Sequence, residues 1–377
     1  MLKHDIIQFK LEGEEWIKAQ NDALNYLNKK HEKDLSKVNQ KLILELAQNA
    51  YIEMKINEVF TKDFFKDNII SLMPISQNIK ATIETLEFEL KKYYFDDFSK
   101  ISFELKNKPK FQVDSDYQEK IQQFQTDFLK SYEFLLDVDR AIQDNDFVQL
   151  KIKIKNKDLE QDRTIQVIAN QKATTEVEKA IIGLKKGDKT EITKDETKLF
   201  IEVDQIKEKK VMPITEENIH LLNLPEIKSL NDVQNQIAKS VTAEIFSDAL
   251  FKYSQEVWQD LFKNNPQLEI PTELLNFELN KNVQNPEEFA KFQEQAKEMI
   301  TQFFWVMLVQ KALKLRPTEE EIQKETKLVQ SFLNEPDPNK IDRGRINYIL
   351  TSKKLGLYYL NQDNKELAAD VEAKIQF

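Results

Sequence analysis

Hydrophobic residues recur every three to four positions over most of this chain, a spacing that predicts long helices. The longest such run follows Pro213, where apolar residues continue at helical spacing over residues 233–261. Other segments alternate between apolar and polar residues, as strands do, and the last two of them are predicted to form a hairpin. These strand segments are residues 4–11, 79–90 and 99–105. The pattern therefore predicts an α+β, multidomain chain with a helical C-terminal half.

The first part of the chain reads as an α+β domain over residues 1–112. Gly13 precedes a predicted helix in which Trp16, Ala19 and Ala23 recur at helical spacing. A lysine-rich segment, residues 29–41, leads into a second predicted helix. Its expected buried face is formed by Leu42, Leu46, Ala50 and Met54.

A single apolar stripe marks the next segment. It consists of Tyr117, Ile121, Phe124, Phe128 and Leu135, and we interpret it as one face of a helix. Such a face needs a partner surface, so residues 113–143 are predicted to be a helical linker that packs on the C-terminal helices. The middle domain would then lie at one end of an elongated molecule.

Composition and missing motifs exclude several kinds of functional site. The net charge of −10 argues against general nucleic-acid binding, and the absence of cysteine excludes disulfides and thiol catalysis. No HExxH, glycine-rich phosphate loop or GxSxG motif occurs, so we expect no cofactor and no metal site. The longest apolar run, residues 303–309, is far shorter than the ~20 residues of a membrane helix. No signal peptide begins the chain, and a cytoplasmic protein without membrane or specific DNA partners is expected.

Glycine is scarce, and two of the five glycines, Gly183 and Gly187, lie in the segment 180–188. Each should mark a backbone requirement such as positive φ. Together with residues 139–148 upstream and 199–208 downstream, this segment resembles the skeleton of an FKBP-type prolyl isomerase domain. The resemblance implies an entering strand, a short helix closed by a glycine turn, and a leaving strand. The domain would cover residues 144–209.

The same resemblance places the isomerase pocket on residues that do not fit it. The family's first-strand aromatic falls at Ile152, its apolar turn before the helix at residues 173–177 with Thr174 and Val177, and its last-strand aromatic near Ile201. The loop that overhangs the pocket in the family would have only residues 193–198. No catalytic residue is assigned, and prolyl isomerase activity is predicted to be weak or lost; a working isomerase is the alternative.

Residues 9–19 match the opening strand and helix of the ribosome-docking domain of the trigger factor family well. The family's docking loop contains glycines, a phenylalanine and a proline. The corresponding stretch here, residues 28–41, has none of them. Lysines remain that could contact phosphate or acidic surface of the ribosome near the exit tunnel. They are Lys29, Lys30, Lys33, Lys37 and Lys41. The alternative is a plain, solvated connection between helices.

In the C-terminal half, residues 268–279 resemble the segment that opens the arms of trigger factor, within a predicted helical domain of residues 210–377. A second apolar series follows on one side of the next predicted helix. Its members are Phe289, Phe292, Met299, Phe303, Phe304 and Met307. Two interpretations are open: an apolar cradle that binds unfolded chains, or ordinary helix packing.

Taken in order, these segments resemble the trigger factor family over nearly the whole chain. The resemblance implies an ATP-independent chaperone that holds nascent or unfolded polypeptides, with roles in protein folding and protein transport. The alternatives are an active peptidyl-prolyl isomerase that assists folding and a helical adaptor for one fixed protein partner.

Overall fold

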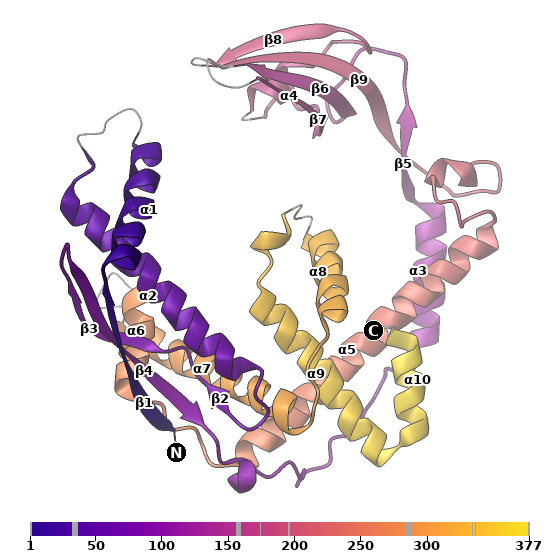
Figure 1. The fold of residues 1–377 in the computed structure, drawn as a ribbon. Coiled ribbons are helices and arrows are strands. Elements are labelled where there is room, and N and C mark those ends of the chain that lie inside the picture. Colours follow the sequence, from indigo (N-terminus) through magenta and orange to yellow (C-terminus); the bar gives the residue numbers. More distant parts are fainter. Residues whose placement is uncertain are drawn as a thin grey trace. The chain divides into compact units, whose positions relative to one another are not determined.

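The computed structural model describes residues 2–31, 37–155, 160–173, 175–194, 197–282, 289–333, 335 and 337–375 (Figure 1). The chain is mixed α and β, as predicted. It divides into two compact units. Unit 1 joins Met1–Gln112 to Ser247–Ala373, and unit 2 comprises Val113–Phe246 with residues 374–376.

The N-terminal part of unit 1 is an antiparallel sheet with two helices. Strand β4 (Thr85–Phe95) is central and pairs with β1 (Lys3–Glu12), β2 (Ile70–Ser71) and β3 (Ile75–Ala81). Helices α1 (Glu14–Lys30) and α2 (Gln40–Phe64) contribute Trp16, Ala23, Ala47 and Ile52 to a core shared with Leu86, Phe88 and Leu90 of β4. The predicted strand at 4–11 is confirmed as β1.

Two predictions for this region are wrong. The predicted partner strand at 99–105 is absent, because the hairpin is formed by β3 and β4 themselves and residues 98–100 form the short helix η2 (Phe98–Lys100). The predicted buried face of α2 also fails, since Ala50 and Met54 are exposed and the buried residues are Ala47, Ile52 and Asp63. Steps of four residues advance about 40° per turn beyond a straight stripe, so a series that begins at Leu42 leaves the core face by Met54.

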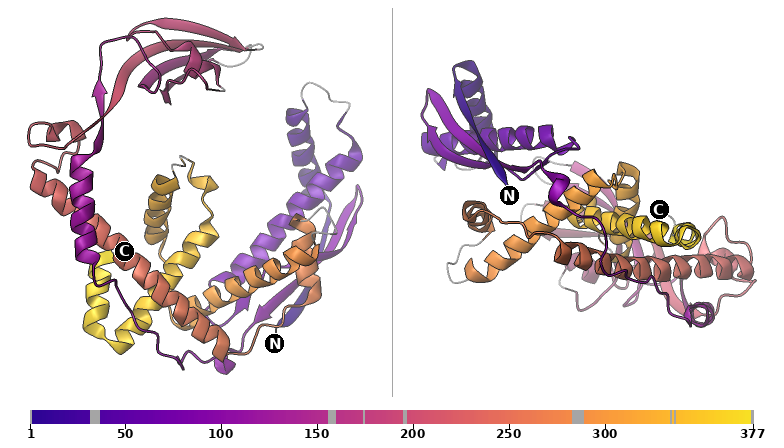
Figure 2. Two further views of the ribbon diagram at one scale, coloured as in Figure 1. Left: turned by 180° about the vertical axis from the view of Figure 1, so that it is seen from behind. Right: turned by 90° about the horizontal axis from the view of Figure 1, so that it is seen from below.

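The C-terminal part of unit 1 is helical. It contains the second half of α5 (Leu230–Asn264), then α6 (Thr272–Asn282), α7 (Phe289–Ala312), α8 (Glu319–Leu333), η5 (Pro338–Lys340), α9 (Arg343–Asp363) and most of α10 (Lys365–Ile375). A capping box begins α8: the Thr318 N–H donates to Glu321 Oε2 at 2.6 Å, and the Glu321 N–H donates to Thr318 Oγ1 at 3.2 Å. Helices α8 and α9 lie side by side in every view, joined by the ion pairs Lys353–Glu325 and Lys354–Glu321 (Figures 1 and 2).

Unit 2 contains a five-stranded antiparallel sheet. Strand β9 (Thr197–Met212) pairs with β5 (Tyr132–Asp137), β6 (Phe147–Lys155) and β8 (Lys189–Lys194), and β6 also pairs with β7 (Glu160–Ile168). The short helix α4 (Glu176–Ala180) and the turns at Gly183 and Gly187 follow, and both glycines have φ +85°. The predicted strand, helix, glycine turn and strand are therefore confirmed as elements, and aliphatic residues of β6, β8 and β9 form their core.

The helix predicted within residues 113–143 ends early. Helix α3 (Tyr117–Lys130) stops before Ser131, and Leu135 lies in β5. The reason is the alternation of residues 132–137, in which Phe134 is buried while Leu135 is not, so this segment completes the sheet by pairing with β9. Within unit 2, α3 and β5 pack on the first half of α5 and on η3 (Ile219–Leu222), through Phe128, Phe134, Ile219, Val233 and Ile237.

Candidate functional site

The positions that the resemblance assigned to an isomerase pocket are filled by the core of unit 2. Ile152 of β6 and Ile201 of β9 are cross-strand partners, and both are buried. Val177 of α4 packs against the same aliphatic cluster. Thr174 lies outside the described residues. The side of the sheet that faces α4 is therefore occupied at these positions by aliphatic side chains.

The connection between β8 and β9 is also short. Ile192 pairs with Leu199 and Lys194 with Thr197, which leaves only residues 195–196 between the strands. A long loop that overhangs a pocket has no room here, as the sequence predicted.

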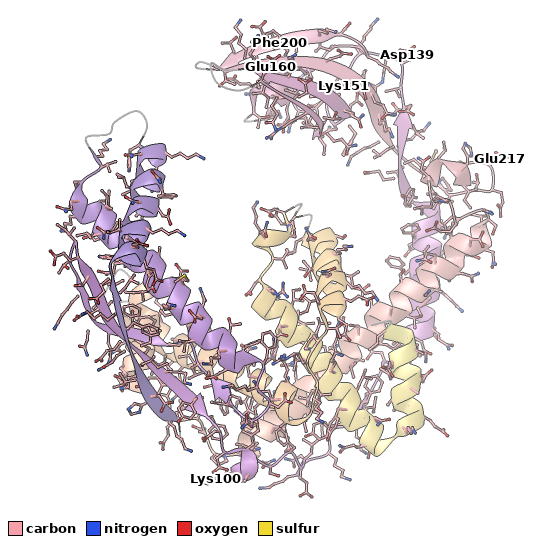
Figure 3. The ribbon with its side chains drawn as sticks, in the orientation of Figure 1. Lys100, Asp139, Lys151, Glu160, Phe200 and Glu217 are labelled. Carbon is pink, nitrogen blue, oxygen red and sulfur yellow. The ribbon has the colours of Figure 1, made fainter. Side chains whose placement is uncertain are left out.

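The opposite face of the same sheet carries a shallow groove of about 680 Å³. Its lining includes Lys151, Phe200 and Glu202, which alternate with the buried residues of β6 and β9 and therefore point away from the core (Figure 3). Lysines in the lining are paired: Lys151 Nζ lies 2.5 Å from Asp204 and Lys189 Nζ 3.0 Å from Glu202. The hydrogen bond to Asp204 raises the pKa of Lys151 and, with a second from Gln149, lowers the pKa of Asp204. These ion pairs hold the lysines of the lining on acidic partners of the same sheet.

The predicted ribosome-contact lysines gather at the connection between α1 and α2. Lys29 and Lys30 end α1, Lys41 lies in the first turn of α2, and Lys37 lies between the helices. The Lys41 side chain is largely exposed, and its Nζ lies 3.9 Å from Glu45 Oε1, which is long for an ion pair and makes the contact weak. Lys33 is outside the described residues. The described lysines are thus near one another along the chain and reach solvent, which keeps an electrostatic contact as a proposal.

The apolar series on α7 does not form one exposed stripe. Phe304 and Met307 are buried, while Phe303 packs in a cluster with Leu72 and Tyr93 from the N-terminal sheet. Phe292 is half-buried in a second cluster, with Leu275 and Leu279 of α6. Phe289 begins α7, and its side chain is outside the described set.

The interpretation of this series as one cradle is therefore corrected. The N-terminal sheet and α6 cover α7, so most of its rings stabilise the fold. Met299, which is 59 % exposed, is the exception among the described side chains of the series.

Other exposed apolar residues of unit 1 escaped the sequence reasoning. Leu328 and Leu333 of α8 are 65 % and 57 % exposed. Residues 322, 325, 326 and 329 of α8 are half-buried, so Leu328 lies outside the apolar face of its own helix. A leucine out of phase with the face of an otherwise amphipathic helix was the signal available in the sequence. We call Met299, Leu328 and Leu333 the exposed apolar set.

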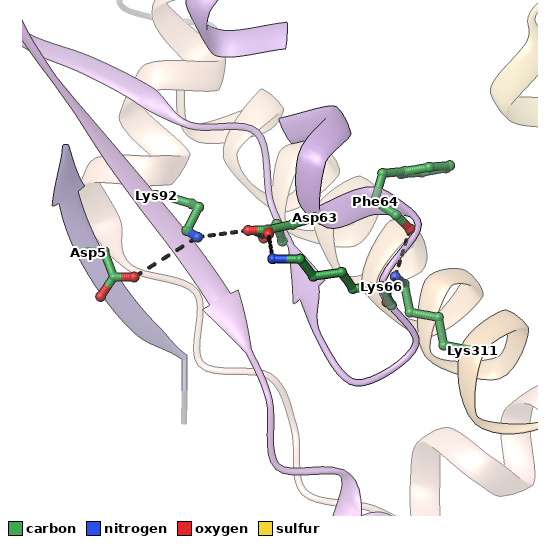
Figure 4. A network of polar contacts seen from close by, with 7 residues as sticks. Asp5, Asp63, Phe64, Lys66, Lys92 and Lys311 are labelled. Atoms are coloured by element: carbon green, nitrogen blue, oxygen red, sulfur yellow. Dashed lines mark hydrogen bonds and ion pairs between the residues drawn. The ribbon is translucent and has the colours of Figure 1, made fainter. Parts of the chain in front are cut away.

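A buried polar network was also missed (Figure 4). The Asp63 carboxylate is buried and accepts hydrogen bonds from Lys66 Nζ at 2.7 Å, Lys92 Nζ at 2.7 Å and Ser71 Oγ at 3.1 Å. Burial alone would raise the pKa of Asp63, but the bonds from Lys66 and Lys92 outweigh it and lower the pKa to about 2. The carboxylate therefore stays ionised at neutral pH and ties the end of α2 to β4.

The C-terminus of α2 is held from the other part of unit 1. Lys311 of α7 donates to the carbonyls of Phe64, at 2.7 Å, and of Lys66, and Arg316 donates to the Phe64 carbonyl at 3.0 Å. Cations at these positions satisfy carbonyls that have no partner within the helix. Burial lowers the pKa of Lys311 to about 8. The role of this joint is structural.

The described parts of the chain were also compared with the requirements of a metal site and of a membrane-spanning helix. No cluster of histidine, aspartate and glutamate there has the arrangement of a metal site. None of the helices there combines the length and the apolar character that crossing a membrane requires.

Comparison with known proteins gives a single kind of match. No family model matches the chain, and no curated protein matches it significantly. Among solved structures, the chain is similar to one of the trigger factor chaperone, described for its promiscuous substrate recognition in folding and assembly activities. The two chains are 17 % identical, the match covers 94 % of this chain and 96 % of that one, and the TM-score is 0.35. At this identity and TM-score the match does not establish the family, and the function must rest on the residues of this chain.

Proposed function

We propose that the protein is an ATP-independent chaperone of the trigger factor type, which holds nascent or unfolded polypeptides and has weak or no prolyl isomerase activity. The observation that carries the proposal is the exposed apolar set on α7 and α8, where Met299, Leu328 and Leu333 each keep more than half of their surface in solvent. The lack of a glycine-rich phosphate loop supports independence from ATP.

Separate exposed side chains suit an unfolded partner. A folded protein needs one continuous complementary surface, whereas a flexible chain can reach several isolated apolar contacts at once. Once one contact has formed, the others are made within the same complex, at high effective concentration. Each single contact stays weak, so the polypeptide can leave again to fold.

The test is suppression of aggregation by the natural chain and by a variant with Met299, Leu328 and Leu333 changed to Gln. A refolding, aggregation-prone client at equal concentration is followed by light scattering. We expect the natural chain to suppress scattering and the variant to lose most of that effect. The matched control changes the neighbouring exposed residues Glu298, Lys327 and Ser331 to Gln, which keeps the net charge. No suppression by the natural chain, or equal suppression by variant and natural chain, would contradict the proposal.

The buried positions of Ile152 and Ile201 support the absence of isomerase activity. A proline-peptide assay should give a rate near that of the uncatalysed reaction, whose barrier is ~18–20 kcal/mol. A clear acceleration would favour the alternative of an active isomerase. A pull-down that returns one stoichiometric protein, rather than many unfolded ones, would favour the adaptor.

A further inference from the structure

An extended segment of unit 1, residues 101–112, connects η2 to the start of α3 without helix or strand pairing (Figure 1). We call it the strap. Its exposure alternates: Ile101, Phe103 and Leu105 are half-buried, while Ser102 and Glu104 are exposed. An extended backbone that lacks a neighbouring strand must satisfy its N–H and C=O groups elsewhere.

Side chains of α5, of the residue that follows it, and of α9 provide those partners. Asn265 Oδ1 accepts the Ser102 N–H at 2.7 Å, and Asn265 Nδ2 donates to the Ser102 carbonyl at 2.9 Å. This is the two-bond exchange that an adjacent strand makes with a paired residue. Tyr359 Oη donates to the Phe103 carbonyl at 2.5 Å.

The carboxylate of Asp260 accepts hydrogen bonds from the middle of the strap. It accepts the Lys106 N–H at 2.7 Å and the Asn107 N–H at 3.2 Å, and also a bond from the Asn107 side chain at 2.7 Å. Although burial alone would raise the pKa of Asp260, these hydrogen bonds lower it, so the carboxylate is ionised when it holds the strap.

Two features of this arrangement point to a binding site. Asp260, Asn265 and Tyr359 are each more than nine-tenths buried, an environment in which polar groups need partners. Their partners on the strap are main-chain groups, apart from the bond that the Asn107 side chain donates to Asp260. Recognition by main-chain groups depends on an extended conformation and not on the identity of the side chains. We call these three residues the strap site.

We propose that the strap site is a binding site for extended polypeptide, which the strap occupies within its own chain and which a client segment takes over when it displaces the strap. The proposal rests on the proposed chaperone function and deepens it by naming what is recognised. The ligand is an extended segment with apolar residues at alternate positions and free N–H groups at the two positions that face Asp260. Proline at either of those positions excludes binding.

The first test uses a fluorescein-labelled peptide with the strap sequence ISFELKNKPKFQ. Its matched control carries N-methyl groups on the residues equivalent to Lys106 and Asn107, which removes the two N–H donors and leaves the side chains. The protein is the full chain, natural or with the strap weakened by Phe103→Ser and Leu105→Ser. We expect the weakened-strap variant to bind the peptide at least tenfold more tightly than the natural chain, and the methylated peptide at least tenfold more weakly than the unmodified one.

Adding Tyr359→Phe to the weakened-strap variant removes one donor without changing the shape of the ring, and should weaken peptide binding several-fold. Equal affinity for the two peptides, or no binding to a folded weakened-strap variant, overturns the proposal.

A second test needs no variant and so stands if the weakened strap prevents folding. Hydrogen exchange at the Lys106 and Asn107 amides of the natural chain is measured with and without excess reduced, carboxymethylated lactalbumin, a permanently unfolded protein. Exchange should speed up severalfold when the client is present, because the client displaces the strap. Unchanged exchange in the presence of bound client contradicts displacement. The aggregation assay separates the two proposals. Suppression of aggregation with unchanged exchange supports the chaperone function and contradicts the strap site. Peptide binding without suppression supports the strap site and contradicts the chaperone function.

Discussion

Asp63→Asn tests whether the buried network at the end of α2 stabilises unit 1 through charge. The substitution keeps the shape of the side chain and one oxygen acceptor, but it removes the negative charge that faces Lys66 and Lys92. Lys92 has the greater need of this charge, because its side chain is mostly buried and its other acidic neighbour, Asp5, is 4.0 Å away. Lys66 is half-exposed and can turn to solvent.

Two routes give the magnitude. The pKa of Asp63 lies near 2, against an ordinary value of 3.8, and at about 1.4 kcal/mol for each pKa step this corresponds to about 2 kcal/mol of stability at neutral pH. Removing one partner of a fully buried pair costs about 3–5 kcal/mol. Since one lysine is solvated and Asn keeps an acceptor, we expect a loss between the two values, about 2–3 kcal/mol.

Urea unfolding followed by tryptophan fluorescence measures this loss directly. Trp16, Trp258 and Trp305 are the three tryptophans of the chain and all belong to unit 1, so the signal reports on that unit. Asp22→Asn, the same chemical change at an exposed position of α1, is the control and should stay within about 0.5 kcal/mol of the natural chain.

The pH dependence separates charge from packing. The folded pKa of Asp63 is depressed, so its contribution is complete above the unfolded pKa of about 4 and is lost as the pH falls towards 2. The gap between the natural chain and Asp63→Asn should therefore shrink by about 1 kcal/mol between pH 6 and pH 3. A gap below 0.5 kcal/mol at pH 7, or a gap of about 2 kcal/mol that does not change with pH, would refute the electrostatic explanation.

Three further predictions concern other parts of the chain. The pKa of Lys311 is about 8 in the folded chain and 10.5 in the unfolded chain, so between these pH values the unfolded chain binds one proton more. The stability of unit 1 should therefore rise with pH in this range. Urea titrations should show a smaller rise in Lys311→Met. Gly356→Val should destabilise unit 1 by about 1–3 kcal/mol in the same assay, since even a Cβ at Gly356 would lie 2.9 Å from Leu250 Cδ1, and an unchanged midpoint would contradict close packing of α9 on α5. Ribosome binding, if electrostatic, should fade steeply with salt in co-sedimentation and be lost when four lysines become Glu, whereas equal pelleting would exclude this segment. The four are Lys29, Lys30, Lys33 and Lys37.

Local signals in the sequence predicted much of the fold. The strand before Gly13 and the long helix after Pro213 both depend on residues close together in the sequence, and both are confirmed. Gly183 and Gly187 likewise adopt the positive φ that their scarcity suggested.

The failures have a different physical origin. Leu135 continues the apolar stripe at helical spacing, but residues 132–137 also alternate, and pairing with β9, 70 to 80 residues later, makes them a strand. Phe303 and Phe304 pack on residues of the N-terminal sheet region and Phe292 on α6, contacts that the spacing within α7 cannot reveal. The burial of Asp63 and Asp260 depends on Lys92 and Lys106, which lie 29 and 154 residues away.

Magnitudes indicate why the exposed apolar set alone would make a poor chaperone. Full burial of Met299, Leu328 and Leu333 contributes about 1.5–3 kcal/mol each, and part of that is already realised because none is fully exposed. The sum is roughly 5 kcal/mol, before the cost of ordering the client, whereas micromolar binding requires about 8 kcal/mol. Apolar contacts of this number would hold a client only at millimolar concentration. At the strap site a client exchanges its own main-chain N–H groups for those of the strap, so its bonds to Asp260 replace existing ones and ask nothing of its side chains. A client without free amides would leave the buried carboxylate unsatisfied, at a cost of about 1–3 kcal/mol, so it should dissociate faster than an equally apolar one whose amides are free.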